Sequence, residues 1–446
     1  TIEVEGPSTN APSESVNIAS TTTDVSVGFS DSPDVPMSNV LSIAPSNSPL
    51  VLPGVMAGRS RGGRVAALKK FGGSSSTERS VSKGLNWLRD HQNADGSWGE
   101  NGGHAPALTA LATLAFLAHG ETPSSQEYGS CVLKAIRKLI EYAGTADADG
   151  MIKAHGNGYG HAMVAYALSE SYALTKIPMI EDAMNKTVGR VVTGQNSLGS
   201  YNYAYNNAPN KESDGGPRSD LSVAGWNYQA LKAAFAAGCT FKGLETAIET
   251  GKSIGLKKTS CVASGGFSYS GSPTGGKGAS PTMTAVGTLC LQLFGEGKSK
   301  EAMAGLKWIE TNNNGALMKC DWQSNTATGR GLYLWYYQTQ ALFQGYSGNG
   351  GSWDIWNKEF QRALMKEQEA DGHWTAPGDK YGDKKGQGGE GLKAGIDTYV
   401  YATSLCCLML EVYYRYLPTF KVTVGAGEGA AAEGGAAAKK DELKIE

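Results

Sequence analysis

Two kinds of helical segment alternate along residues 79–418, and they differ in where their charged residues fall. In the first kind, apolar residues recur every three or four positions among charged ones, which predicts a helix with one face in water. The second kind is nearly free of charge and apolar on every side, as is typical of a buried helix. The six segments of the first kind are 81–91, 131–142, 180–190, 244–256, 299–311 and 353–369. The six of the second kind are 105–119, 159–174, 221–237, 280–294, 331–344 and 396–417.

A short loop motif joins each charged segment to the apolar segment that follows it. It is clearest as Gln-Asn-Ala-Asp-Gly-Ser-Trp at 92–98 and Gln-Glu-Ala-Asp-Gly-His-Trp at 368–374, and weaker copies occur in the other four loops. Glycine marks every copy, at steps of 54, 49, 67, 49 and 57 residues, which is the period of a helix-pair repeat. The marker glycines are Gly96, Gly150, Gly199, Gly266, Gly315 and Gly372.

We predict that this motif fastens the repeats together and is not an active centre, because it recurs around the whole repeat array. Its glycine permits the turn, its tryptophan covers a helix end, and its amides satisfy helix termini. The structural residues of the two clearest copies are Gln92, Gly96, Trp98, Gln368, Gly372 and Trp374.

The alternation predicts an all-α fold, an (α/α)6 toroid of six helix-pair repeats. A helix pair cannot bury its own apolar face, and an open stack of pairs needs capping repeats at its ends, so we expect the stack to close into a ring. The charged segments then form the outer ring and the apolar segments the inner ring. Residues 79–418 are expected to be one domain, between an extended arm at 1–78 and a tail at 419–446 with a short strand-like stretch.

The arm and the tail have compositions unlike the repeat domain. Residues 1–56 are rich in Ser, Thr, Pro and Asn and carry six acidic residues but no Lys or Arg, which predicts an extended arm. A basic stretch, 59–70, follows, and it is either a docking strip for an acidic surface or a solvated linker. Strand-like stretches in the arm and the tail are suited to pairing with a neighbouring chain. The residues we assign to assembly are Val25, Val27, Phe29, Arg59, Arg61, Arg64, Val422 and Val424.

Composition narrows the classes of protein. A net charge of −2, with cations spread over the outer helices, gives no nucleic-acid footprint. The chain has no run of 18 apolar residues, so we expect no membrane span, and it begins without Met, which suggests a removed export or anchor segment and a secreted, periplasmic or cell-surface protein. The seven scattered cysteines predict mostly buried thiols, and no Cys-x-x-Cys or His-x-x-x-His spacing occurs, so we expect no metal and no cofactor.

Six helix pairs with a Gln-x-x-x-Gly-x-Trp loop resemble the terpenoid cyclase and protein prenyltransferase toroid, also known as the prenyltransferase and squalene oxidase repeat. The resemblance covers residues 79–418. The stretch 331–344, Gly-Leu-Tyr-Leu-Trp-Tyr-Tyr-Gln-Thr-Gln-Ala-Leu-Phe-Gln, particularly resembles bacterial toroid proteins of planctomycetes and verrucomicrobia, most of which have no assigned activity. The resemblance implies a fold that carries cyclisation, prenyl transfer, thioester chemistry or pectate cleavage, so it does not choose an activity.

The catalytic motifs of those families are absent. Where the resembling cyclases have Asp-x-Asp-Asp-Thr-Ala, residues 394–399 keep one carboxylate, Asp397, which we expect to cap the last inner helix. The prenyltransferases bring Asp, Cys and His to zinc, and here Asp397 and Cys406 have no His in or after the last inner helix. No cysteine is followed by Gly-Glu, so the thioester motif is missing as well.

Aromatic residues on the inner helices offer a candidate ligand cavity, although packing is the alternative explanation for them. His155 and His161, together with Glu170, form the one local acid–base cluster of the sequence, and hydrogen bonding at the helix start is its alternative explanation. The candidate cavity residues are Tyr166, Trp226, Tyr228, Tyr333, Trp335, Tyr336, Tyr337, Asp397 and Tyr399.

Two functions remain open. The preferred one is a non-catalytic exported toroid that assembles into a homo-oligomer or filament, or binds a partner, through its arm and tail. The alternative is a toroid-type enzyme, similar to a terpene cyclase or a polysaccharide lyase or hydrolase, that holds a small molecule or glycan in an aromatic central cavity.

Overall fold

The computed structural model describes residues 54–100, 102–148, 150–154, 157–205, 217–270, 278–322, 331–377 and 395–415, all within one compact unit, Ile43–Glu446. The predicted assembly residues Val25, Val27, Phe29, Val422 and Val424 lie outside the described residues, as does His155. The proposed strand pairing of arm and tail therefore stays a prediction.

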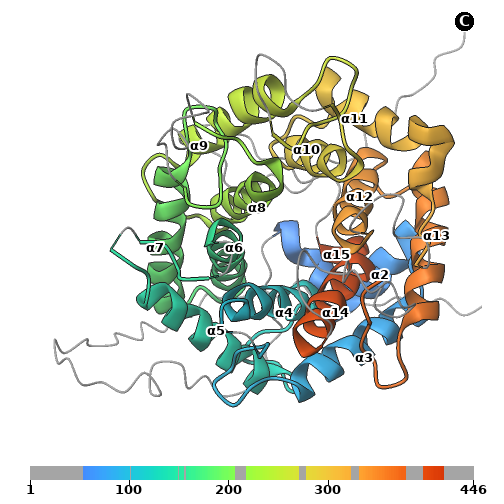
Figure 1. Ribbon diagram of the computed structural model, residues 1–446. Helices are drawn as coiled ribbons and strands as arrows, with labels where there is room; N and C mark the ends of the chain where they lie inside the picture. Colours follow the sequence, from blue (N-terminus) through green and yellow to red (C-terminus); the bar gives the residue numbers. More distant parts are fainter. Residues whose placement is uncertain are drawn as a thin grey trace, which may run out of the picture. The chain divides into compact units, whose positions relative to one another are not determined.

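The described chain forms an α/α toroid, with six inner helices enclosed by an outer ring of helices (Figure 1). None of the described residues forms a β-strand. The inner helices are α4 (Ala105–His119), α6 (Asn157–Thr175), α8 (Leu221–Ala237), α10 (Pro281–Leu293), α12 (Gly331–Gly345) and α14 (Ile396–Leu410). The outer helices are α3 (Ser75–Asp90), α5 (Gly129–Gly144), α7 (Pro178–Gly194), α9 (Leu244–Thr250) with η2 (Gly251–Ser260), α11 (Lys300–Thr311) and α13 (Gly351–Glu367).

The two kinds of helix are built as the pattern predicts. Outer helix α5 buries one stripe that includes Val132, Ile136 and Leu139, while its polar face remains in water. Inner helix α4 buries every residue except Ala107. The predicted inner and outer rings are thus confirmed, with element ends displaced by a few residues.

Two stretches differ from the predicted helices. The fourth outer segment is an α-helix that continues as the π-helical η2. The last inner helix ends at Leu410 and is followed by the short helix α15 (Val412–Arg415), whereas the sequence predicted one helix from 396 to 417.

The ring closes where repeat six meets repeat one. Helix α14 packs against both α4 and α3, so the last inner helix contacts the first helix pair (Figure 1). Gln368, in the sixth loop, donates from Nε2 to the carbonyl of Ser80 in α3 at 2.9 Å. Gln92 makes the matching contact between repeats one and two, from Nε2 to the carbonyl of Cys131 at 3.0 Å. The junction that closes the ring is therefore held by the same glutamine-to-carbonyl hydrogen bond as the junction between repeats one and two.

The loop motif is the fastener that the sequence predicts. Gly96 has φ of 88° and Gly372 has φ of 107°, a backbone region that favours glycine. Trp98 and Trp374 each donate from the indole Nε1 to a carbonyl at the end of the preceding outer helix, at 2.8 Å. A Cβ atom on Gly96 would lie 2.4 Å from the carbonyl oxygen of Lys134, so the glycine also permits close packing on the next outer helix.

Three further elements lie at one end of the ring. They are η1 (Gly54–Arg59), α2 (Arg61–Phe71) and α15, and they pack on one another and on the end of α4 (Figure 1). We call this the capped end, where the inner helices finish. At the opposite end, which we call the loop end, the repeat loops lead into the inner helices.

Candidate functional site

The capped end contains a buried cluster of charges. Arg59, at the end of η1, has no exposed surface and donates from Nη1 to Glu170 Oε2 of α6 at 2.8 Å. The same guanidinium donates to the carbonyls of Leu117 at 3.1 Å and Arg415 at 3.0 Å. Arg415 donates in turn to the hydroxyl of Tyr166 at 2.8 Å. These contacts connect η1 and α15 to the centre of the ring.

Two more buried ionisable groups share the electrostatic environment of this cluster. Burial lowers the pKa of Lys232 well below its ordinary value, although the charge of Glu170 opposes the shift. Burial raises the pKa of Glu411 to about 8, against the charges of His119 and Arg415. The Glu411 carboxylate oxygens have no hydrogen-bond partner among the described residues. Adding a further charge among these buried groups would therefore cost free energy, and we expect the capped end to have a structural role.

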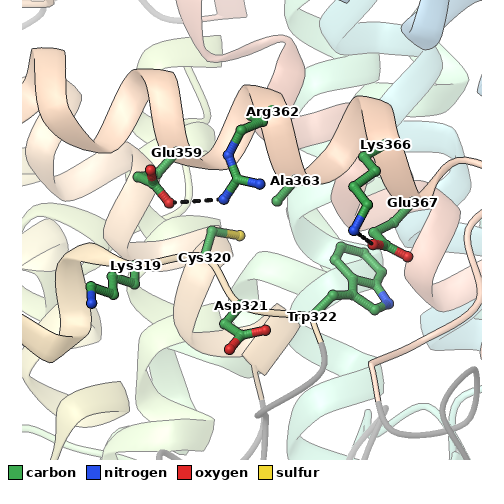
Figure 2. Close-up of a pocket in the computed structure, with 9 residues that line it drawn as sticks. All are labelled: Lys319, Cys320, Asp321, Trp322, Glu359, Arg362, Ala363, Lys366 and Glu367. Carbon is green, nitrogen blue, oxygen red and sulfur yellow. Dashed lines mark hydrogen bonds and ion pairs between the residues drawn. The ribbon is translucent and has the colours of Figure 1, made fainter.

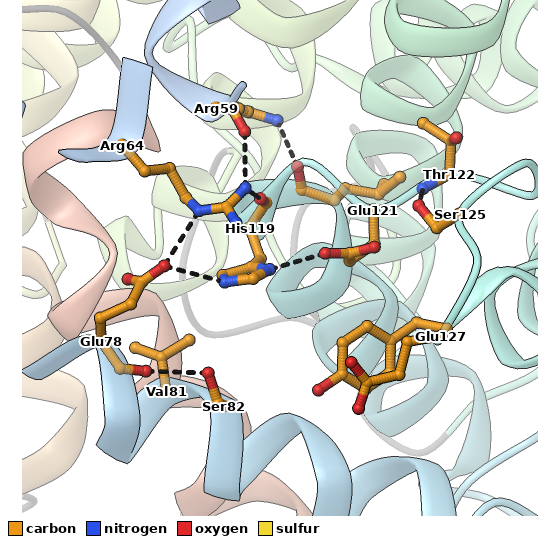
Figure 3. A network of polar contacts seen from close by, with 12 residues as sticks. Arg59, Arg64, Glu78, Val81, Ser82, His119, Glu121, Thr122, Ser125 and Glu127 are labelled. Carbon is orange, nitrogen blue, oxygen red and sulfur yellow. Dashed lines mark hydrogen bonds and ion pairs between the residues drawn. The ribbon is translucent and has the colours of Figure 1, made fainter. Parts of the chain in front are cut away.

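A second polar network ties the cap to the outer ring (Figure 3). Arg64 of α2 donates to Glu78 of α3 at 2.9 Å, and the His119 ring lies 3.1 Å from Glu78 and 2.7 Å from Glu121. Burial alone would lower the pKa of His119, but its hydrogen bonds to Glu121 and Glu78 outweigh burial and raise it to about 9. Imidazolium therefore joins two carboxylates at neutral pH.

The contacts of the arginines in η1 and α2 bear on the role in assembly that the sequence predicted for them. Arg59 and Arg64 are engaged inside the chain, and only Arg61 of the three has an exposed side chain that a neighbouring chain could contact. The basic stretch 59–70 is thus part of the cap of its own ring, an alternative that the sequence did not suggest.

The aromatic residues proposed to line a cavity are buried, and several pack against one another. Trp226 stacks on Tyr336 with ring centroids 5.4 Å apart and meets Tyr333 and Tyr337 edge-on. Tyr336 also accepts a hydrogen bond from Arg415 at 3.3 Å, so this group continues into the charged cluster with Tyr166. Aromatic and charged side chains of the inner helices and α15 therefore pack against one another here.

The other proposed cavity residues lie elsewhere. Tyr228 donates to the carbonyl of Gly199 in the third loop at 2.8 Å. Trp335 packs on Trp322, with ring centroids 5.6 Å apart, in the segment before α12. Asp397 and Tyr399 are at the loop end, at the start of α14. The sequence thus grouped residues that the fold divides among at least three places.

The loop end brings a histidine and a carboxylate together at the seam between the last and first repeats. His104 Nδ1, directly before α4, lies 3.3 Å from Asp397 Oδ2, and the two side chains are 20% and 14% exposed. Asp397 Oδ1 accepts from the backbone N–H of Glu100 at 2.7 Å. The expectation that Asp397 caps α14 is therefore wrong. The N-cap position is Gly395, which has no side chain to cap the helix, and the Asp397 carboxylate contacts the first loop instead.

A second histidine–carboxylate pair belongs to the sixth loop. His373 Nδ1 lies 2.6 Å from Asp371 Oδ1, and the His373 ring is 4.8 Å from the ring of Tyr399. Burial would raise the pKa of Asp371, but the hydrogen bonds of its carboxylate to His373 lower it. We call His104, Asp397, Asp371, His373 and Tyr399 the seam site.

Partly exposed tyrosines also lie at the loop end, near the starts of α6 and α8. Tyr203 is 43% exposed and meets the ring of Tyr159 edge-on, with centroids 5.4 Å apart. The hydroxyl of Tyr159 is hydrogen-bonded to that of Ser222. Aromatic faces beside hydroxyl groups are suited to ligands with both apolar and hydroxylated surfaces.

The seam site has the parts needed for proton transfer. An imidazole whose Nδ1 faces a carboxylate is held in one orientation, and histidine transfers protons near neutral pH. Among the described residues, no group of three or more His, Cys, Asp or Glu side chains could hold a metal ion. The two histidine–carboxylate pairs are suited to acid–base chemistry.

The predicted local acid–base cluster is not assembled among the described residues. His161 lies 2.9 Å from the carbonyl of Thr187 and accepts from the N–H of Ile152, and burial lowers its pKa to about 4. Glu170 faces the cap instead. His161 therefore bonds both the segment before α6, at Ile152, and outer helix α7, at Thr187. The seven cysteines are free thiols, five of them buried, as predicted.

Sequence reasoning selected Asp397 and Tyr399 and missed His104, Asp371 and His373. One signal was available, because the sixth copy of the motif has His373 where the first has Ser97. His104 gave no signal of its own, since its partner is 293 positions away.

Comparison with solved structures places this fold among known toroids. A GH76A α-1,6-mannanase from Salegentibacter sp. HEL1_6 matches with a TM-score of 0.53 at 11% identity, over 76% of this chain and 98% of that one. A cellobiose 2-epimerase from Spirochaeta thermophila DSM 6192 matches with a TM-score of 0.52 at 15% identity, over 74% and 93%. The chain has the α/α-toroid fold.

The remaining comparisons do not identify a family for the chain. A variant of the type II terpene cyclase MstE from Scytonema matches at a TM-score of 0.47 and 12% identity, over 78% of this chain and 99% of that one, which is too low to support an argument about function. No protein-family model matches the chain, and the search of curated proteins found no relative. No described helix is long and apolar enough to cross a membrane.

Proposed function

We propose that this protein is an acid–base enzyme that acts on a glycan, with its reaction centre at the loop end of the toroid. The observation that carries the proposal is the His104–Asp397 pair, half-buried at the starts of two neighbouring inner helices. His104 transfers the proton, and Asp397 orients its ring and stabilises the imidazolium that forms. Asp397 is itself held by the N–H of Glu100.

The surroundings of the pair favour a hydroxylated substrate. Tyr399 on one side and Tyr159 and Tyr203 elsewhere on the loop end offer aromatic surfaces and hydroxyl groups. Such rings pack against the C–H faces of sugars while polar neighbours bind the hydroxyls. The mannanase and the epimerase carry carbohydrate activities on this fold, but the same fold hosts many chemistries, so the proposal rests on the side chains.

A terpene-cyclase reading fits the described centre less well. A carbocation pathway needs an apolar chamber lined by aromatic faces, whereas here the aromatic group of Trp226 and Tyr336 leads into the Arg59–Glu170 ion pair. Buried guanidinium groups at that position repel a cationic intermediate.

The test is turnover of a panel of oligosaccharides, with neutral manno- and cello-oligosaccharides and a uronate-containing series, followed by NMR. We expect one series to be converted, and His104→Ala and Asp397→Asn to abolish its conversion while the fold persists. His91→Gln is the matched control, because His91 is exposed and lies close to the carbonyl of Trp87 in its own helix. Failure of every series, or full activity in His104→Ala, contradicts the proposal.

Assembly through the arm and tail, and export of the chain, are separate proposals that rest on composition alone. Residues 1–53 carry the strand-like stretch with Val25 and Val27. Light scattering of the full chain and of a variant lacking those residues tests the assembly, because a monomer in both cases excludes a role for the arm in self-association.

A further inference from the structure

One of the six repeat junctions is built differently from the others. A Cβ atom placed on the marker glycine of the first, second, third, fourth or sixth loop would meet atoms of the next outer helix within 4 Å. In the fifth loop, the one described atom that a Cβ on Gly315 would meet within 4 Å is the carbonyl oxygen of Glu310, in its own repeat, at 3.3 Å. The fifth loop is therefore not packed against α13 in the way that the other loops pack against their neighbours.

A cavity of about 240 Å³ lies at this junction, between the segment after η3 (Asn312–Met318) and helix α13 (Figure 2). Cys320 and Trp322 line it on one side, and Glu359, Arg362 and Glu367 on the other. The cavity thus lies at the junction whose marker glycine lacks the contact with the next outer helix.

The cavity combines buried and exposed polar groups. Glu367 is 3% exposed and its Oε1 lies 3.4 Å from Lys366 Nζ. Arg362 donates to Glu359 Oε2 at 3.1 Å, one turn away on the same helix, α13. Trp322 is 2% exposed, and its indole N–H has no hydrogen-bond partner among the described residues. Leaving a buried N–H unsatisfied costs about 1–3 kcal/mol, which a bound acceptor would recover.

We propose that this cavity is a binding site for a single neutral sugar ring. Its lining holds three cations and three anions, Lys319, Arg362, Lys366, Asp321, Glu359 and Glu367, so it has no net charge with which to select an ionic ligand. Carboxylates accept from hydroxyl groups, while guanidinium, ammonium and indole N–H groups donate to them. A ligand whose hydroxyl groups both donate and accept hydrogen bonds matches this mixture of acceptors and donors.

The size of the cavity also limits the ligand. Pockets for drug-sized molecules have volumes of about 300–1,000 Å³. At about 240 Å³ this cavity is smaller, so it admits one ring and not an oligosaccharide. The site lies on the outer ring at α13 and shares no residue with the seam site, so it is independent of the proposed reaction centre.

Binding is tested by ligand-observed NMR and calorimetry on the full chain, with methyl glycosides of glucose, mannose and galactose. Glucuronate and glycine serve as charged and zwitterionic probes. We expect at least one neutral glycoside to bind at millimolar concentration and both charged probes to bind more weakly. Trp322→Phe keeps an aromatic side chain but loses the indole N–H, and should weaken binding about tenfold.

Two further variants keep the test decisive. The Arg362 side chain is 62% exposed, so Arg362→Gln leaves the fold intact and should weaken binding about three- to tenfold. Ile355→Thr, on an exposed part of the same helix, should leave binding unchanged. The double variant His104→Ala, Asp397→Asn should also bind normally, which separates this site from the reaction centre. The proposal would be overturned by no binding, by stronger binding of a charged probe, or by Trp322→Phe and Arg362→Gln both binding as tightly as the unmodified protein.

Discussion

The two ends of the toroid hold their ionisable groups in opposite ways. At the capped end, Arg59 and Glu170 form an ion pair with no exposed surface, and the surrounding carbonyls and hydroxyls take up further bonds. At the loop end, the side chains of His104 and Asp397 remain 20% and 14% exposed. A fully enclosed pair stabilises packing, whereas a half-buried pair can exchange protons with a substrate. We therefore assign structure to one end and chemistry to the other.

The largest effect is expected at the loop end, on activity alone. His104→Ala should lower kcat/KM for the converted oligosaccharide by about 10²–10⁴-fold, because a positioned general acid or base contributes that much. The free energy of unfolding should change by less than about 1 kcal/mol, since the side chain is part-exposed. Steady-state kinetics and urea unfolding of the same preparation measure both. A large loss of stability with little loss of rate would reverse the roles assigned to the two ends.

The next largest effect is expected at the capped end, on stability. Arg59→Met removes the nearer of the two guanidinium groups that face the buried Glu170, leaving Arg415 at 4.0 Å, and should cost about 3–5 kcal/mol. The matched control is Arg61→Met, since Arg61 is exposed two positions further along. Chemical denaturation followed by circular dichroism gives both values. Equal stability of the two variants would show that the structural role of the capped end does not depend on the ion pair.

Stability should also fall at alkaline pH because of the cap. The folded-state pKa of His119 is raised to about 9, so its contribution is fully present below the unfolded value of about 6.5 and is lost as pH rises through 9. The loss is about 3 kcal/mol at most. His119→Gln should flatten the decline between pH 7 and about 9 in urea unfolding curves.

The titration of Glu411 lowers stability over a lower pH range than the titration of His119, so the two contributions can be measured separately. Burial raises its folded pKa to about 8, so the folded state binds more protons than the unfolded state from about pH 4.5 to 8 and stability falls across that range. Glu411→Gln should remove that part of the slope and leave the decline near pH 9. If His119→Gln retains the full alkaline decline, the imidazolium link between Glu78 and Glu121 is not what holds the cap.

The smallest effect concerns the fasteners at the loop end. Gly96→Ala places a side chain at φ of 88° and close to the carbonyl of Lys134, and should destabilise by about 2 kcal/mol. Gly144→Ala, at an exposed position with no atom within 4 Å of the new Cβ, should stabilise by about 0.5 kcal/mol. Thermal unfolding distinguishes them, and similar melting points would mean that the loop end is not held by its turns.

The sequence predicts the repeated parts of this protein well and the unique parts poorly. Gly96 and Trp98 were assigned correctly because their roles are local and recur around the ring. The role of Arg59 was not predictable, because its partner Glu170 is 111 positions away and the glycines around 59–70 suggest a linker. The fold brings His104 to Asp397 only when the ring closes. Residues that act at the closure therefore carry no local pattern.

The most direct test is hydrogen–deuterium exchange of the full chain, with and without the oligosaccharide that it converts. We predict slower exchange on ligand binding in peptides that cover residues 99–108 and 395–401 at the loop end. Peptides that cover residues 54–71 and 410–415 at the capped end should be unchanged. Ligand protection confined to the capped end, with none at His104 or Asp397, would contradict the assignment of chemistry to the loop end.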